Sequence, residues 1–273
     1  MQERTKFMDG IHDIHSEQYH SSYGLNRSRL MLFQRSPYHF MADNLSTETK
    51  EPTEAMIFGN LAHCAVLEPH LLDENYIVSP KFDRRTKAGK FAACQFQATL
   101  AGRIPVSFDM FQTAQNMADV VMTYDMARML IEDSDIERSI YFTYKGIQCK
   151  VRPDVWRNKI VVDYKTTNDA SPYAFQSSAY KYGYYLQCGM IVAAMAAINR
   201  PIEKFVIIAQ EKEPPHAIGI YDFDYDAMQY GLQLFDSLID SYILCLETGS
   251  WPSYGYQTLT KPGYAKLNEV NHE

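Results

Sequence analysis

The spacing of apolar residues changes along the chain, and each change marks a predicted element. Residues 137–144 and the stretch 146–167 contain short apolar runs rich in β-branched and aromatic residues, as expected of strands. Tight turns are predicted at Lys145-Gly146 and Arg157-Asn158. These segments therefore predict a three-stranded meander.

Helical patterns precede and follow this meander. Ser171 and Pro172 suit the N-cap and the first helical position of a long helix over residues 171–198. Ser28 is the expected N-cap of a short amphipathic helix, which Ser36-Pro37 breaks before a second short helix. The other predicted elements are a loop at 45–53, a helix from 54 that ends at 69, a strand at 75–80, mainly helical residues at 91–134, strands at 203–210 and 216–223, and a helix at 224–248.

This order of elements predicts an α/β fold with a mixed central sheet and helices on its faces. At 273 residues the chain suits one large domain or one domain with appendages. We expect an irregular lead-in at 1–23, a single domain at 24–248 and an irregular tail at 249–273.

Composition narrows the function classes. The net charge of −7 argues against a protein that coats nucleic acid with its whole surface, but a local basic groove is compatible with it. No apolar run approaches the roughly 18 residues that span a bilayer, and the first residues lack the apolar core of a signal peptide. The five cysteines form no CxxC pair, so we expect a reducing cytoplasm and no zinc ribbon.

One strongly basic segment stands out in this acidic chain. Residues 81–90, KFDRRTKAGK, contain five cations and a single acid. A solvated loop is one interpretation, and a contact surface for an anionic partner is the other.

The candidate chemistry lies in the second half of the meander. Asp154 lies near the end of one strand, and Asp163 and Lys165 point to one face of the next because side chains alternate along a strand. Two carboxylates suit Mg²⁺ or Mn²⁺, and the carbonyl of Tyr164 would add a third oxygen. The expected reaction is phosphodiester hydrolysis. A surface ion pair between Asp163 and Lys165 is the alternative.

Two helices carry further candidates. His63 shares a helix face with Gly59, and a packed core histidine is the alternative to a ligand. Tyr180, Tyr184 and Gln187 are spaced to share one face of the long predicted helix.

The ordered motifs from 20 to 247 resemble the PD-(D/E)XK nuclease superfamily, and within it the RecB-like branch and RecE-type phage and prophage exodeoxyribonucleases. The motifs are FGNLAHCAVLEP, DRRTKAGK, CKVRPDV, VVDYKTT and YYLQCGM, after the stretch EQYHSSYGLNRSRLMLFQRSPYHF. Many superfamily members have Glu where this chain has Asp163, but Asp is usual in the RecB-like branch. The cysteine set of iron–sulfur relatives is missing, so the resemblance implies no iron–sulfur cluster.

The resemblance implies a role for each matching residue. Metal ligands would be His63, Asp154, Asp163 and the Tyr164 carbonyl, and the catalytic residues Asp154, Asp163, Lys165 and Gln187. Gln187 would position DNA and the lysine, with Tyr184 one turn earlier. DNA contacts would come from Arg27, Ser28, Arg84, Arg85, Lys87, Lys90 and Tyr184, with Arg27 and Ser28 at a helix start holding a 5′-phosphate; ordinary helix capping is the alternative for these two. Glu137 is a weaker candidate, either for a second metal or for a place behind the ligands, and Tyr180 is a weaker candidate behind the ligands.

We therefore expect a Mg²⁺-dependent 5′→3′ exonuclease on linear duplex DNA that leaves 3′ single strands for recombination. Its expected partners are DNA ends, a RecT-like annealing protein and further copies of itself in a ring, with no membrane, in the cytoplasm of a bacterial host. An endonuclease or single-strand nuclease in repair or CRISPR spacer acquisition is an alternative. A non-catalytic DNA-binding protein of the same fold is another.

Overall fold

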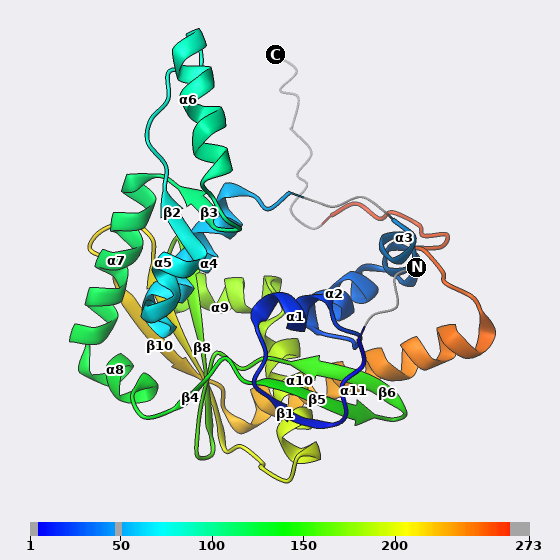
Figure 1. Ribbon diagram of the computed structural model, residues 1–273. Coiled ribbons are helices and arrows are strands. Elements are labelled where there is room, and N and C mark those ends of the chain that lie inside the picture. Colours follow the sequence, from blue (N-terminus) through cyan, green and yellow to red (C-terminus); the bar gives the residue numbers. More distant parts are fainter. Residues whose placement is uncertain (1–4, 47–50, 263–273) are drawn as a thin grey trace, which may run out of the picture.

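The computed structural model describes residues 5–46 and 51–262. A five-stranded sheet forms its centre (Figure 1), in the order β10 (Ile218–Asp222), β9 (Lys204–Glu211), β8 (Ile160–Thr167), β7 (Val155–Arg157), β4 (Asp135–Ile136). β8 and β9 run parallel, and the other pairs are antiparallel. The predicted mixed sheet is therefore confirmed, and β8 lies at its middle.

The predicted meander divides into two sheets. β5 (Ser139–Tyr144) and β6 (Ile147–Val151) join β1 (Gly10–His12) in a separate three-stranded sheet, through the predicted turn at Lys145-Gly146. Glu137, between β4 and β5, has a positive φ of 53°. Pro153, between β6 and β7, has no N–H to donate to a neighbouring strand. Strand pairing is therefore interrupted at the same level on both segments of the chain. The Glu137 N–H donates to the Asp154 carbonyl across the break, 3.0 Å away.

Helices cover both faces of the central sheet. On one face lie α4 (Glu54–Leu67), α7 (Phe108–Thr123) and α8 (Asp125–Ile131), and on the other α9 (Pro172–Lys181), α10 (Tyr184–Ala197) and α11 (Tyr225–Thr248). Val162 and Tyr164 of β8 pack on the face that α4, α7 and α8 cover, whereas Val161 packs on the face that α9, α10 and α11 cover. Burial on both faces explains the nearly continuous apolar run of this strand.

The long helix predicted over 171–198 is two helices. Lys181 ends α9, Gly183 takes a left-handed φ of 71°, and Tyr184 begins α10. The predicted shared face is therefore wrong for Tyr180, which is 69% exposed on α9, whereas Tyr184 and Gln187 do lie together on α10. The predicted helix start at Pro172 is confirmed, but the predicted helix does not include the interruption at Gly183.

The N-terminal half also differs from the prediction. Asn26, not Ser28, caps α2 (Arg27–Arg35), because its side chain accepts from the Arg29 N–H. α3 (Pro37–Leu45) begins at Ser36-Pro37 as predicted. The lead-in predicted to be irregular contains β1 and α1 (Ser16–Ser21). After α11, residues 249–262 form no helix or strand, and residues 263–273 lie outside the described part of the chain.

The basic segment belongs to an arm that rises from the α4–α7 side. After α4 come the 3-10 turn η1 (Pro69–Leu71), α5 (Leu72–Asn75) and β2 (Tyr76–Val78), which pairs in parallel with β3 (Ile104–Val106). Between β2 and β3, α6 (Lys87–Ala98) projects from the body of the molecule (Figure 1), and none of its residues is buried. We call residues 79–103 the arm.

No helix in the described ranges has both the length and the apolar character to cross a membrane.

The tightest helix crossing yields a stability prediction. A Cβ on Gly189 of α10 would lie 2.0 Å from the backbone carbonyl oxygen of Gly231 in α11. We expect Gly189→Ala to lower the free energy of unfolding by about 2 kcal/mol or more, because neither backbone can withdraw from the other. Urea unfolding followed by circular dichroism measures the change.

Gly59→Ala in α4 is the matched control. Its Cβ would lie 3.8 Å from the Thr166 hydroxyl, an ordinary contact, and alanine favours a helix over glycine by about 0.8–1.0 kcal/mol. The control is expected to be neutral or stabilising. Equal effects of the two substitutions would contradict the close crossing.

Candidate active site

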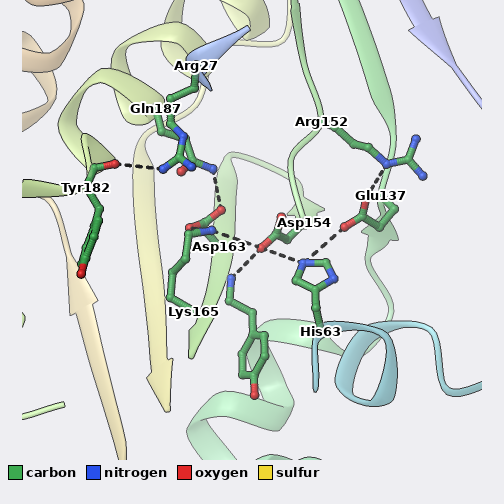
Figure 2. A network of polar contacts seen from close by, with 10 residues as sticks. Arg27, His63, Glu137, Arg152, Asp154, Asp163, Lys165, Tyr182 and Gln187 are labelled. Atoms are coloured by element: carbon green, nitrogen blue, oxygen red, sulfur yellow. Dashed lines mark hydrogen bonds and ion pairs between the residues drawn. The ribbon is translucent and has the colours of Figure 1, made fainter. Parts of the chain in front are cut away.

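The break in the two long strands brings Glu137 and Asp154 together against a helix. His63 Nε2 lies 3.1 Å from Asp154 Oδ2 and 3.4 Å from Glu137 Oε1 (Figure 2). Within the described residues, these three side chains form a group whose ligand atoms all lie within 4.8 Å of one another. The two carboxylates suit a hard divalent cation such as Mg²⁺ or Mn²⁺, and the imidazole is a ligand typical of transition-metal ions.

His63 reaches the carboxylates from α4, which covers the first face of the sheet. Gly59, one turn earlier, lies against Thr166 of β8, so the helix approaches the sheet closely at this point. The imidazole is partly exposed and faces two acids. This placement favours the ligand interpretation over a packed core histidine.

Asp154 is held by the backbone of the neighbouring strand. Its Oδ2 accepts a hydrogen bond of 2.8 Å from the Tyr164 N–H. The Tyr164 side chain points to the opposite face, where its hydroxyl donates to Gln210 Oε1 at 2.6 Å. The N–H and C=O of one strand residue point to the same neighbouring strand, so the Tyr164 carbonyl lies on the edge that carries Asp154.

Asp163 and Lys165 point together to the α10 face, as the strand alternation predicts. The Lys165 ammonium contacts Asp163 Oδ2 and lies 3.9 Å from Asp154 Oδ2. Gln187 Nε2 of α10 donates to Asp163 Oδ1 at 2.6 Å, and Gln187 Oε1 is buried without a hydrogen-bond partner in the described structure. The ring of Tyr184 lies 5.6 Å from Lys165 Nζ.

These contacts bear on three expected assignments. Asp163 is fully buried, both its oxygens face Lys165 and Gln187, and it is not in the ligand group that the structure brings together. Glu137, a candidate either for a second metal or for a place behind the ligands, is in that group. Tyr184 is buried against Lys165 and offers DNA little surface, because α10 starts there and its ring turns inward.

Burial and charge set the protonation of the group. Burial and the Asp154 carboxylate raise the pKa of Glu137 to about 7. Burial alone would lower the pKa of His63, but Asp154 and Glu137 outweigh it and raise that pKa to about 9. Burial opposes ionisation of Asp154, yet Lys165 and His63 hold its pKa well below the usual range. His63 therefore supplies positive charge between two acids, as a bound cation would.

Burial and neighbouring charges also shift the pKa values of Asp163 and Lys165. Burial and the Asp154 carboxylate raise the pKa of Asp163 to about 6. Burial disfavours the charged form of Lys165, but the Asp163 and Asp154 carboxylates outweigh it and raise the pKa of the ammonium. Lys165 therefore stays protonated at neutral pH, so it can act as a fixed cation rather than as a base.

A cavity of about 540 Å³ opens onto the ligand group. Its walls include Arg27 and Ser28 from the first turn of α2, and Gln187 from α10. Arg27 Nη1 donates to the Tyr182 carbonyl at 3.1 Å. The expected pair at a helix start therefore does face the same space as the carboxylates, although Ser28 is not the cap.

The arm rises from the rim of this cavity. Tyr76 of β2 and Ile104 of β3, at the base of the arm, line the cavity. Arg84, Lys87 and Lys90 are exposed, and in the described ranges no ion pair joins them to a carboxylate. Arg85 is also exposed but pairs with Asp83 at 2.9 Å.

Sequence reasoning missed Arg152. This residue pairs with Glu137 and is largely buried beside the ligand group. One signal could have found it: Arg152 lies two positions before Asp154 in CKVRPDV, whereas Glu137, which interrupts the apolar pattern just before β5, was already a candidate. Neither feature of the sequence says that the two positions face each other across a strand break.

Comparisons with known proteins identify the family of the chain and support its fold. Residues 27–259 match the family described as PDDEXK-like domain of unknown function (DUF3799). A crystal structure titled "Putative exonuclease" from Eubacterium rectale covers 92% of this chain and 96% of that chain, with a TM-score of 0.65 and 14% identity. The crystal structure of SSO0001 covers 80% of this chain and 88% of that chain at 15% identity, with a TM-score of 0.28, too low for any argument. None of the curated proteins has significant sequence similarity to the chain.

The opposite directions of the Tyr164 side chain and backbone can be tested. We expect Tyr164→Phe to lower the free energy of unfolding by about 1–3 kcal/mol, because Gln210 Oε1 loses its donor in a buried place. The N–H that binds Asp154 remains, so any activity of the protein should persist. Thermal or urea unfolding measures the loss.

Tyr173→Phe serves as the control, since this tyrosine is 89% exposed on α9. It should leave stability within about 0.5 kcal/mol of the parent. A Tyr164→Phe protein as stable as the Tyr173→Phe protein would show that the buried hydrogen bond is not formed.

Proposed function

The chain belongs to the family of PDDEXK-like domains (DUF3799), and from this premise we propose that it is a divalent-metal-dependent exodeoxyribonuclease acting on linear double-stranded DNA. One observation carries the proposal. His63, Glu137 and Asp154 converge beside Lys165 at the mouth of a cavity, where a phosphodiester can be polarised and its developing charge stabilised.

The residues present fit a hard divalent cation. His63, Glu137 and Asp154 would hold it, with the Tyr164 carbonyl on the same edge and Asp163 behind. When bound, Mg²⁺ or Mn²⁺ supplies Lewis acidity toward a phosphate oxygen and lowers the pKa of a coordinated water. Carboxylate oxygens and one imidazole are not the thiolate set that selects softer metals.

Lys165 and Gln187 have separate tasks in this proposal. Lys165 carries a fixed ammonium beside Asp154 and would stabilise the negative charge that grows on the phosphate oxygens. Gln187 donates to Asp163, which in turn contacts Lys165, so the amide fixes the position of the ammonium. The buried Oε1 of Gln187 would accept a hydrogen bond from a group that enters the cavity.

The walls of the cavity suggest a DNA end as substrate. Arg27 and Ser28 at the start of α2 would hold a terminal 5′-phosphate, because a helix N-terminus and a guanidinium both favour an anion. Arg84, Arg85, Lys87 and Lys90 would follow the duplex backbone along the arm, which fixes register without reading sequence. We further propose 5′→3′ polarity, use of the 3′ strands by a RecT-like annealing partner in recombination, and a ring of several copies.

Digestion of labelled DNA tests the reaction. Linear duplex labelled at the 5′ or the 3′ end, with and without a 5′-phosphate, is compared with a covalently closed circle in Mg²⁺, Mn²⁺ or EDTA. We expect degradation of linear duplex alone, dependent on metal, with early release of the 5′ label. Lys165→Met should slow it by about 10²–10³-fold, because the transition-state charge loses its fixed cation.

Lys159→Met is the matched control. Lys159 precedes the same strand, is exposed and pairs with Glu203 far from the cavity. Its rate should stay within about twofold of the parent. Cleavage of the closed circle would assign an endonuclease instead, and full activity of Lys165→Met or in EDTA would refute the proposed chemistry.

The arm makes a second prediction. Replacing Arg84, Lys87 and Lys90 by Gln should weaken duplex binding and flatten the slope of log affinity against log salt by about 0.9 for each lost phosphate contact. Fluorescence anisotropy with the slow-cleaving Lys165→Met protein in EDTA measures the affinity and its salt dependence. The control replaces Arg128, Lys159 and Lys204 by Gln, an equal charge change away from the arm. Equal losses in both triple variants would rule out a specific contact.

A further inference from the structure

Arg152 connects the ligand group to a segment that lies outside the matched family domain. We propose that Arg152 is a positioning residue, which fixes the Glu137 carboxylate for metal binding by anchoring it to the N-terminal segment. This segment, residues 10–22, contains β1 and α1 and precedes the matched range 27–259. The inference rests on the proposed function in one respect, namely that Glu137 binds a divalent cation.

Arg152 contacts one oxygen of the Glu137 carboxylate and leaves the other to the ligand group. Its Nε contacts Oε2, whereas Oε1 faces His63 at 3.4 Å (Figure 2). The guanidinium thus occupies one oxygen and leaves the other to face His63 and Asp154. A planar guanidinium presents its donors in a rigid fork, so it fixes the direction of the carboxylate as well as its charge.

The rest of the guanidinium is tied to two other elements. Nη1 donates to the Ile14 carbonyl at 2.9 Å and to the Ser139 hydroxyl at 2.6 Å. The ring of Tyr19 in α1 lies 5.9 Å from its central carbon. Because both Arg152 and Glu137 are largely buried, these donors exchange water for protein acceptors and the side chain has little freedom. The N-terminal segment therefore provides one fixed end of the chain of contacts that ends at Glu137.

The backbone at Glu137 explains why such an anchor is needed. Glu137 has a φ of 53°, a backbone conformation that residues other than glycine adopt at a cost in free energy. The hydrogen bond from its N–H to the Asp154 carbonyl fixes the backbone, but the Glu137 side chain could still adopt several rotamers. The ion pair with Arg152 selects the one in which Oε1 faces the ligand group.

A second cation, which lies on β6, anchors the same N-terminal segment 10–22. Lys150, two residues before Arg152, is buried and donates to the carbonyls of Tyr19 and Ser22. Ser22 in turn shares a hydrogen bond of 2.7 Å with the Tyr141 hydroxyl. Ser16, Glu17, Tyr19 and His20 also line the cavity. The segment is therefore a fixed wall of the candidate active site, and Arg152 is its contact with the ligands.

Metal affinity of the full chain tests the proposal without DNA or turnover. Isothermal calorimetry measures Mn²⁺ binding to the parent, Arg152→Gln, Arg152→Lys and Arg138→Gln proteins. We expect Arg152→Gln to weaken Mn²⁺ about 10–100-fold, the range seen when a residue that orients a metal ligand is lost. Arg152→Lys keeps the cation but not the fork and should recover part of that affinity.

Arg138→Gln is a stringent control. Arg138 also bridges the N-terminal segment to the strands, through Asp13 at 2.5 Å and Asp135 at 3.5 Å, but it does not touch Glu137. It should leave Mn²⁺ affinity within about twofold. An equal loss in Arg138→Gln would mean that general loosening of the segment, not Arg152, is responsible, and would overturn the proposal.

A double-mutant cycle adds a measurement that a merely structural role would not move. In a Glu137→Gln background, Arg152→Gln should cause no further loss of Mn²⁺ affinity, because the carboxylate that it positions is gone. If Arg152→Gln does not fold, Ser139→Ala, which removes one anchor of the guanidinium, should weaken Mn²⁺ several-fold. Unchanged affinity in whichever variant folds would refute the inference while leaving the metal site intact. A parent protein that binds no Mn²⁺ would refute the proposed function and the inference together.

Discussion

Three buried carboxylates, on Glu137, Asp154 and Asp163, are the constraint on which the rest of this structure depends. An ionised carboxylate in an apolar interior is costly unless it is paired and hydrogen-bonded. Here each acid has a cation from a different part of the chain: Arg152 for Glu137, His63 for Asp154 and Lys165 for Asp163. The pairing requires α4, the break after β6 and the end of β8 to meet at one point.

The strand break is what makes this meeting possible. An unbroken meander would space its side chains along one flat face and leave Glu137 and Asp154 on a regular ladder. The positive φ at Glu137 and the missing N–H of Pro153 end that ladder and separate the two sheets. The two acids lie at the same level beside the break, and both line the cavity.

Both helical layers take part in the site, together with the N-terminal segment. His63 comes from the α4 side, and Gln187 from α10 on the other side. The close crossing at Gly189 holds α10 against α11, two residues after the amide that contacts Asp163. Segments distant in the sequence thus hold the catalytic candidates in place, which is how a preorganised site avoids rearrangement during reaction.

The sequence by itself determined the local features. Alternation along β8 put Asp163 and Lys165 on one face and Tyr164 on the other, Pro37 and Pro172 marked helix starts, and His63 lay on a helix as predicted. These are properties of neighbouring residues, which backbone geometry fixes within a few positions.

Only the tertiary structure decided which acids would meet. Glu137 joined His63 and Asp154, whereas Asp163 was taken up by Lys165 and Gln187, and Arg152 tied Glu137 to the N-terminal segment. Tyr180 was separated from Gln187 by the left-handed Gly183. Each outcome depends on where a strand or helix is interrupted and on which elements pack at that interruption. Such contacts join residues far apart in sequence, and no periodicity or spacing along the chain encodes them.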